Sequence, residues 1–282
     1  MMPKNTPNTG FGALGLPDFV LERISRLGFV LPTPIQAEAI PALLNGADVI
    51  GLAQTGTGKT LAFAAPMAAL LERGELGLVL APTRELAQQI EETFIELGVH
   101  VALLVGGTPI RPQIEALKRY PDVVVATPGR LIDHLEQRTI DLRCVTMLVL
   151  DEADRMLDIG FAPAIKRIVA ETPDDRQTML FTATFGKEIE KMAKQYLYDP
   201  QRIEVARSGS AVEEVTQELI VLDQEEMTSM LKKILNDFDG SVLVFSRTRH
   251  GARRLARIVR NHGHEAAELH AELGAPTPYP SS

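Results

Sequence analysis

A glycine-rich segment at residues 53–60, AQTGTGKT, contains residue types that bind phosphate. Gly56 and Gly58 let backbone N–H groups turn toward phosphate oxygens, and a helix starting at Lys59 would present its positive end to the same group. The Lys59 ammonium can reach the β- and γ-phosphates of a nucleotide, and the Thr60 hydroxyl can ligate Mg²⁺. The first residue of the segment is alanine where the general pattern has glycine, and the alternative is a turn that merely links a strand to a helix. Because an apolar run precedes the segment and a helical pattern follows it, we favour a phosphate-binding loop.

The acids Asp151 and Glu152 directly follow the apolar run Met147–Leu150 and form a second candidate group. An acid that follows an apolar strand beside a phosphate loop holds Mg²⁺, so we predict Asp151 and Thr60 as metal ligands. Glu152 is placed to polarise a water molecule against the γ-phosphate, as a general base. Together with Lys59, the two acids form the predicted catalytic group of a nucleotide hydrolase.

Short apolar runs alternate with helical patterns along most of the chain, and these elements would position both groups. Buried strands that alternate with helices form a mainly parallel sheet covered on both faces, so the predicted fold class is α/β. Ligands of such sheets bind beyond the carboxyl ends of the strands, where both groups stand. The expected strands are Asp48–Ala53, Leu78–Ala81, Val101–Val105, Val123–Ala126, Met147–Leu150, Met179–Ala183 and Arg202–Val205. The expected helices include Pro17–Leu27, one that begins at Pro34, Lys59–Leu71, Arg84–Leu97, Gly129–Gln137 and Lys187–Tyr196.

The pattern divides the chain into four segments. Residues 1–10 are polar and are expected to form a flexible N-terminus. Residues 11–206 would form a nucleotide-binding domain, and the small polar residues 207–214 would form a linker. Residues 215–282 show a smaller α/β pattern. Because only about 60 residues follow the linker, where a domain of this type needs on the order of 150, we expect the sequence to stop inside a second domain.

The second pattern consists of three expected strands and two expected helices. The strands are Thr216–Leu222, Ser241–Phe245 and Glu265–Leu269, and the helices are Glu225–Phe238 and His250–Asn261. Residues 241–264 contain six arginines and no acid. Such a run is either a solvated helix face or a surface that contacts phosphates.

Composition and charge restrict the possible functions. Lysine and arginine number 29 against 37 acids, which gives a net charge of −8, whereas proteins that coat nucleic acid are usually basic. Any nucleic acid would therefore bind at a local site, and the absence of tryptophan argues against a broad base-stacking surface. One cysteine allows no intrachain disulfide and fits a reducing compartment, so we predict a cytoplasmic location. Neither a membrane span nor a secretory leader is expected.

The letters DEAD at 151–154 resemble the name-giving motif of the DEAD-box ATP-dependent RNA helicases, and other motifs of that family occur in the family's order. Residues 28–36 resemble its adenine-reading motif, and Thr182–Thr184 stands where the family usually has Ser-Ala-Thr. Residues 82–87, 106–107 and 127–130 resemble its three RNA-backbone motifs, and residues 244–248 resemble the first motif of its second domain. The resemblance covers about residues 11 to 270. It implies a RecA-like P-loop domain followed by an incomplete second RecA-like domain.

The resemblance also implies three groups of site residues. The ATP-binding group comprises Phe11, Phe29, Thr33, Gln36, Gln54, Thr55, Gly56, Thr57, Gly58, Lys59 and Thr60. The RNA-binding group comprises Pro82, Thr83, Arg84, Gly107, Thr127, Pro128, Gly129, Arg130, Ser246 and Arg247. The coupling group comprises Asp154, Thr182 and Thr184, whose hydrogen bonds would connect the nucleotide state to the grip on RNA.

Several of these residues also have local interpretations. The Gln36 amide suits the edge of adenine, which favours ATP over GTP, but on spacing alone Gln36 would be a helix surface residue. Thr83 and Thr127 could cap the helices that follow them, and Asp154 could cap its own helix. The RNA-binding residues include no base reader, so we predict sequence-independent contacts to the backbone of a single strand or short duplex.

The expected function is therefore that of an ATP-dependent RNA helicase, in which ATP hydrolysis with Mg²⁺ drives local unwinding or remodelling of RNA. The alternative is a module that binds nucleotide and RNA without helicase turnover. This alternative arises because no His-Arg-x-Gly-Arg string occurs in the sequence, although the family uses its arginines to complete the ATP site. A P-loop kinase or transporter ATPase is disfavoured by Gln36 and by the acids at 151–154.

Overall fold

The computed structural model describes most of the chain, and contacts divide it into two compact units, Met1–Ser210 and Ala211–Ser282. The described residues are 10–54, 56–205, 218–223, 226–238 and 240–269. The predicted linker at 207–214 and nearly all of the predicted flexible N-terminus lie outside these ranges. The domain boundaries therefore stay predictions.

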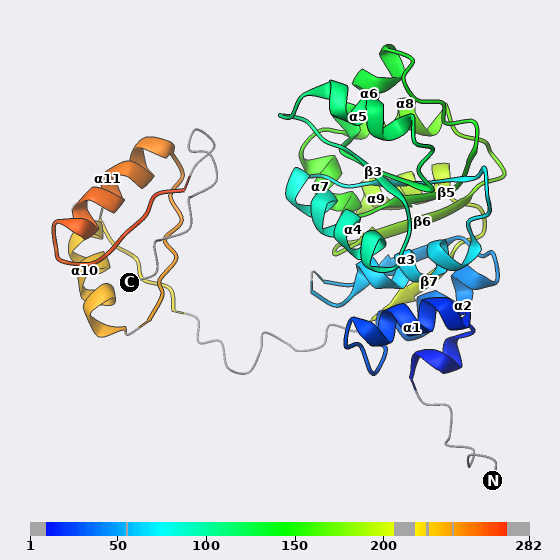
Figure 1. The fold of residues 1–282 in the computed structure, drawn as a ribbon. Coiled ribbons are helices and arrows are strands. Elements are labelled where there is room, and N and C mark those ends of the chain that lie inside the picture. Colours follow the sequence, from blue (N-terminus) through cyan, green and yellow to red (C-terminus); the bar gives the residue numbers. More distant parts are fainter. Residues whose placement is uncertain (1–9, 55, 206–217, 224–225, 239, 270–282) are drawn as a thin grey trace, which may run out of the picture. The chain divides into compact units, whose positions relative to one another are not determined.

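The first unit is built on a seven-stranded sheet with the order β3-β4-β2-β5-β6-β1-β7, in which all pairings are parallel (Figure 1). The strands are β1 (Val49–Leu52), β2 (Leu76–Leu80), β3 (Val101–Leu104), β4 (Val123–Ala126), β5 (Val145–Leu150), β6 (Gln177–Thr182) and β7 (Gln201–Glu204). Every residue of β1, β2 and β4 is buried, which explains why these strands are continuous apolar runs. The predicted mainly parallel α/β fold is confirmed.

Helices cover both faces of the sheet, and each layer buries its own hydrophobic core. Helices α1 to α4 pack on the face that carries Val79 and Phe181, and α5 to α9 pack on the face that carries Leu80 and Leu180 (Figure 1). The bounds are η1 (Phe11–Leu14), α1 (Asp18–Arg26), α2 (Pro34–Leu44), α3 (Lys59–Leu70), α4 (Arg84–Glu96), α5 (Ile110–Leu117), α6 (Pro128–Glu136), α7 (Ala153–Asp158), α8 (Ala162–Val169) and α9 (Lys187–Tyr196). Because the strands are parallel, the loops that follow them emerge at one edge of the sheet.

Three helices of this unit were not predicted from the sequence: α5, α7 and α8. Helix α7 has only six residues, and α5 contains Pro112 in its first turn, so neither offers a long helical pattern. In the part of the chain that the structure describes, no helix has the length and apolar character needed to cross a membrane. The single cysteine, Cys144, is exposed.

The second unit contains helices α10 (Met227–Asp237) and α11 (Arg249–Arg260), close to the two helices predicted there. The strand predictions are wrong where the residues are described, because 218–222, 241–245 and 265–269 are not in strands. A strand is stable only when a neighbouring strand satisfies its backbone N–H and C=O groups, and the described part of this unit has no such pairing. The apolar residues at 242–245 are consequently exposed.

The buried carboxylate of Asp48 joins three strands at the amino edge of the sheet. Its Oδ1 accepts a hydrogen bond from Thr178 N at 2.7 Å, and its Oδ2 accepts one from Tyr198 N at 2.7 Å. Its backbone oxygen accepts a third from Gln201 N at 2.8 Å. Asp48 therefore ties β1 to the beginning of β6 and to the segment that leads into β7.

Replacing Asp48 with alanine should lower the free energy of unfolding by about 3 kcal/mol, because two buried N–H groups lose a charged acceptor. Urea unfolding followed by circular dichroism measures this change. The same substitution at the exposed Asp175 is the control and should change stability by less than about 0.5 kcal/mol. Equal effects at the two positions would contradict the role of Asp48.

Candidate functional site

The glycine-rich loop joins the end of β1 to the start of α3, as a phosphate-binding loop requires. Gly56 and Gly58 have φ angles of 81° and 85°, a backbone region that side chains other than glycine rarely adopt. Lys59 is the first residue of α3 and is only 6% exposed, and its Nζ has no hydrogen-bond partner among the described residues. Thr57 Oγ1 donates a hydrogen bond to Gln54 O at 2.7 Å, and Thr55 lies outside the described residues. The loop thus holds a buried cation that needs an anionic partner.

Gln36 contacts the phosphate loop from α2. Its Oε1 accepts a hydrogen bond from Thr33 N at 2.9 Å, and its Nε2 donates one to Gly58 O at 3.0 Å. A side chain at position 58 would collide with this amide. Because Gln36 is only 2% exposed, its interpretation as a helix surface residue is wrong. The Thr33 hydroxyl is also buried and has no hydrogen-bond partner in the described part of the chain.

The two aromatic residues predicted for the ATP site differ in exposure. Phe29 is 49% exposed, so its ring is accessible to a ligand, whereas Phe11 is buried within the hydrophobic core. Thr60, the predicted metal ligand, follows Lys59 in the first turn of α3 and is half-buried.

The acidic pair lies where β5 ends. The Asp151 backbone N–H donates to Leu80 O at 3.0 Å, and its Oδ1 accepts from Glu152 N at 2.9 Å. Burial raises the pKa of Asp151 to about 6, although the positive charge of Lys59 opposes this rise. The sheet therefore brings the carboxylate of Asp151 within the electrostatic influence of the Lys59 ammonium.

Glu152 adopts a left-handed backbone conformation, with φ 49° and ψ 51°, directly before α7. This conformation costs a residue with a side chain roughly 1–2 kcal/mol. The carboxylate of Glu152 forms an ion pair with the guanidinium of Arg155, with 3.3 Å between Oε2 and Nη1. A strained backbone at a candidate general base is typical of functional sites.

The raised pKa of Asp151 predicts how stability depends on pH in metal-free protein. A carboxyl whose pKa is higher in the folded protein than in the unfolded chain stabilises the fold fully at pH values below its unfolded pKa. This contribution is lost as the pH rises through the folded pKa of about 6. Replacing Asp151 with asparagine should therefore raise the free energy of unfolding by about 3 kcal/mol at pH 7.5 and have little effect at pH 4. Urea unfolding in the presence of a chelator tests this, and a destabilised variant at pH 7.5 would contradict it.

The predicted coupling residues are in contact. Asp154 Oδ2 accepts hydrogen bonds from Thr184 N at 2.9 Å and from Thr184 Oγ1 at 2.8 Å. Thr182 Oγ1 donates to Thr184 O at 2.9 Å, and a hydrogen bond from the Thr182 side chain also helps to lower the pKa of Asp154. Burial alone would raise the pKa of Asp154, but hydrogen bonds from Thr184 and from the Arg155 backbone hold it below its usual value. Asp154 thus links the start of α7 to the end of β6 and is more than a capping acid.

In the first unit, the residues predicted to bind RNA lie in the loops after β2, β3 and β4 or in the first turns of α4 and α6. Thr83 Oγ1 accepts a hydrogen bond from Leu86 N at 3.2 Å and so caps α4, while Thr127 precedes α6 without a capping bond from its side chain. Gly107 has a φ of 75° and lies against the exposed Arg84 guanidinium, which a side chain at position 107 would hit.

Arg130 contacts the loop after β3 as well. Its Nη1 donates a hydrogen bond to Thr108 O at 3.0 Å, and its Nε lies 3.3 Å from Asp133 Oδ2. Pro82 and Pro128 are buried, and Gly129 is exposed. In the second unit Ser246 and Arg247 are exposed.

The structure therefore assembles two clusters from the predicted residues of the first unit. One comprises Gln36, Gly58, Lys59 and Asp151, and the other comprises Arg84, Gly107 and Arg130. Sequence analysis missed three residues that are hydrogen-bonded to the second cluster or to one another. Thr108 accepts a hydrogen bond from Arg130, Gln113 donates one to Thr108, and His134 contacts Gln113. His134 lies at a helical spacing from Leu131, so its position in the sequence does not distinguish it from an ordinary core residue.

Comparisons with known proteins agree with this geometry. The family described as DEAD/DEAH box helicase matches residues 33–192 of the chain. The chain is 40% identical to "DEAD-box ATP-dependent RNA helicase 20" of Arabidopsis thaliana, in a match that covers 94% of this chain and 56% of that protein. It is 42% identical to "ATP-dependent rRNA helicase rrp3" of Sclerotinia sclerotiorum, in a match that covers 93% of this chain and 57% of that protein.

A solved structure is also similar. It is a DEAD box protein from the hyperthermophile Methanococcus jannaschii, with a TM-score of 0.68 and 34% identity. The match covers 94% of this chain and 74% of that one. The chain spans a little over half the length of the two helicases it matches. With more than half of its residues matched by the family, the chain belongs to the DEAD/DEAH box helicases.

Proposed function

We propose that this chain binds ATP with Mg²⁺ and RNA as part of an ATP-dependent RNA helicase. The observation that carries this proposal is the buried ammonium of Lys59 at the start of α3, which has no hydrogen-bond partner among the described residues and lies within the electrostatic influence of the buried acid Asp151. A buried charge without a partner is costly, and the phosphates of a nucleotide would supply one. The similarity to proteins named RNA helicases supports RNA as the second ligand.

The residues present fit a magnesium–nucleotide complex. Among the described residues, no group of three or more His, Cys, Asp or Glu side chains could hold a metal by itself. Magnesium at nucleotide sites needs no such group, because it takes one or two protein oxygens together with phosphates and water. Thr60 and Asp151 would provide the protein oxygens. The bound ion would neutralise charge that develops on the phosphates.

The remaining residues divide the work on ATP. Glu152 would accept a proton from the attacking water as that water reaches the γ-phosphorus, while Lys59 would hold the γ-phosphate oxygens. Gln36 would read the adenine edge, because each atom of its amide has used one hydrogen bond and an amide can form more. Asp154 and Thr184 would transmit a change at the γ-phosphate from α7 to β6.

RNA would bind through its backbone. Arg84 and Arg130 offer guanidinium groups on either side of the loop after β3, and Gly107 allows close approach of a phosphate. Ser246 and Arg247 in the second unit are further proposed RNA contacts. Since none of these groups reads a base edge, binding should not depend on sequence.

The proposal is tested by titrating the whole chain with fluorescent nucleotides and with labelled RNA. ADP and ATP should compete for the site at least about tenfold better than GDP and GTP, because guanine presents a different pattern of donors and acceptors to the remaining hydrogen-bonding positions of the Gln36 amide. A ten-nucleotide uridine strand should bind more tightly than the corresponding DNA because of its 2′-hydroxyls. Equal binding of adenine and guanine nucleotides would contradict the role of Gln36.

The alternative is that the chain binds both ligands without helicase turnover. It is favoured by one observation, the absence of the His-Arg-x-Gly-Arg string from the sequence. Measurement of RNA-stimulated hydrolysis and duplex separation distinguishes the two, because the alternative predicts binding without either activity. The two functions share the same ATP and RNA contacts. We keep a cytoplasmic location as a further prediction.

A further inference from the structure

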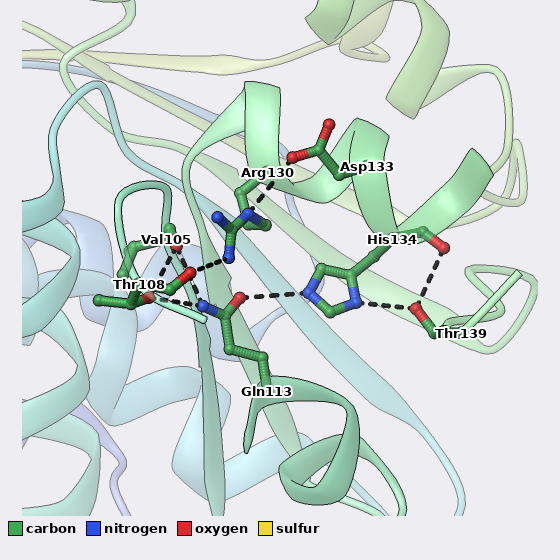
Figure 2. A network of polar contacts seen from close by, with 7 residues as sticks. All are labelled: Val105, Thr108, Gln113, Arg130, Asp133, His134 and Thr139. Carbon is green, nitrogen blue, oxygen red and sulfur yellow. Dashed lines mark hydrogen bonds and ion pairs between the residues drawn. The ribbon is translucent and has the colours of Figure 1, made fainter. Parts of the chain in front are cut away.

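A buried polar network lies beneath the second cluster and joins helices α5 and α6 (Figure 2). His134 on α6 is fully buried, and Gln113 on α5 is only 7% exposed. The His134 Nε2 lies 3.2 Å from Gln113 Oε1, and its Nδ1 lies 2.7 Å from Thr139 Oγ1. The Gln113 Nε2 donates to Val105 O at 3.0 Å and to Thr108 Oγ1 at 2.8 Å. The network thus runs from the end of α6 to the loop after β3.

The chemistry of these groups fixes the direction of each hydrogen bond. Val105 O can only accept, so the nitrogen of the Gln113 amide must face it and the amide oxygen must face His134. His134 therefore donates from Nε2, which leaves Nδ1 of the neutral ring as an acceptor facing the Thr139 hydroxyl, whose single hydrogen can point to Nδ1 or to His134 O at 3.2 Å. Burial, and next the positive charge of Arg130, lower the pKa of His134 and so favour this neutral ring.

The loop that Gln113 holds is the one that both arginines of the second cluster contact. Gly107 lies in this loop against the Arg84 guanidinium. The next residue, Thr108, accepts a hydrogen bond from Gln113 on its side chain and one from Arg130 on its backbone oxygen (Figure 2). A change in the Gln113 amide would therefore move the loop between the two guanidinium groups.

We propose that Gln113 is a positioning residue for RNA binding and that His134 orients its amide, so that Arg84, Gly107 and Arg130 form one phosphate-binding surface. This inference rests on the proposed function, in which that surface holds RNA. Gln113 need not touch RNA, because it acts through the loop. A fully satisfied network of this kind gives a single rigid arrangement, and partial loss leaves a buried carbonyl without its donor.

The network could instead serve stability alone, and the two roles predict different results. If the network only stabilises the fold, its loss weakens the whole fold. At temperatures below the melting temperature, RNA binding and nucleotide binding should then change together, or neither should change. A positioning role predicts selective loss of RNA affinity in protein that is still folded. The phosphate loop at 53–60 is a suitable internal reference, because it belongs to the other cluster.

The test uses the whole chain with Gln113→Leu, His134→Leu and His134→Gln. Fluorescence anisotropy with a labelled ten-nucleotide uridine strand measures RNA binding, and a fluorescent ADP measures nucleotide binding, both well below the melting temperature. The two leucine variants should bind RNA about tenfold more weakly and ADP unchanged, since misplaced phosphate contacts cost on the order of one tenfold step in affinity. His134→Gln should restore RNA binding, because its amide nitrogen can donate to Gln113.

Asp48→Asn is the matched control, because it weakens a buried network at the opposite edge of the sheet. It should lower the melting temperature without changing RNA affinity. Gln113→Leu protein that binds RNA like the wild type, or that loses RNA and ADP equally, would overturn the inference. Failure of the wild type to bind RNA would overturn the proposed function instead.

Hydrogen exchange keeps the two failures separate, because it requires no RNA. Amide exchange at residues 105–110 should become faster in Gln113→Leu and His134→Leu and stay close to the wild-type rate in His134→Gln, while exchange at 53–60 stays unchanged. Unchanged exchange at 105–110 would overturn the positioning role whether or not the wild type binds RNA.

Discussion

Replacing Lys59 with alanine is expected to weaken ATP binding by about a hundredfold, because charge-assisted contacts to two phosphates are lost. The reason lies in the burial of the ammonium, whose Nζ finds no partner among the described residues. Unliganded protein holds this charge at a cost, so the alanine variant should unfold no more easily than the wild type. Binding energy and stability therefore change in different directions at this position.

Lys187 provides a matched control for that substitution. It is also the first residue of a helix, α9, and it also follows a glycine, but it is exposed. Lys187→Ala removes the same charge and should leave nucleotide affinity unchanged. Titration with fluorescent ATP in the presence of Mg²⁺ compares the two variants with the wild type. Affinity of Lys59→Ala within threefold of the wild type would show that residues 53–60 do not bind phosphate.

Replacing Glu152 with glutamine should slow hydrolysis by about a thousandfold while ATP still binds, because the amide cannot accept a proton from water. Single-turnover measurements with protein in excess over labelled ATP, with and without RNA, separate this chemical step from binding. They also register slow hydrolysis, because a single turnover is sufficient for detection.

Glu136→Gln is the control for the Glu152 substitution. Glu136 also forms an ion pair with an arginine, since its Oε1 lies 2.7 Å from Arg167 Nη1 on the surface. This variant loses an ion pair but no general base, so its hydrolysis rate should equal that of the wild type. If both variants hydrolyse ATP equally well, Glu152 is not the base and its strained backbone has another cause.

Most elements of the first unit could be predicted because strands such as β1, β2 and β4 are apolar runs in which every residue is buried. The position of a ligand edge followed from the parallel topology, and Gly56, Lys59 and Asp151 were identified by residue type and order. Gln36 shows what helical spacing alone cannot predict. Its spacing predicts a surface residue, whereas its side chain is buried and donates a hydrogen bond to Gly58, 22 residues along the chain. Residue patterns cannot reveal such contacts, since they join segments far apart in the chain.

The failures have equally physical causes. The expected strand at 241–245 is apolar enough, but a strand needs a paired neighbour, and sequence pattern says nothing about whether one is present. Gln113 and His134 were not predicted as site residues, because neither residue by itself indicates a contact with the other. Only the distance between their side chains in the structure shows that they form one network. Asp48 was assigned to a strand with no role, although its carboxylate holds two later segments.

The position of β1 in the sheet has a consequence for how the chain folds during synthesis. Within the described residues, β1 pairs with β6 and β7, and the hydrogen bonds of Asp48 span 130 and 150 residues. Contacts of such long sequence separation form slowly, because a large loop must close first. On the ribosome β1 emerges early and must wait for the last strands of its unit. The glycine-rich loop that follows β1 is thus among the last features to form, so binding of a nucleotide at this proposed site would report that the whole unit has folded.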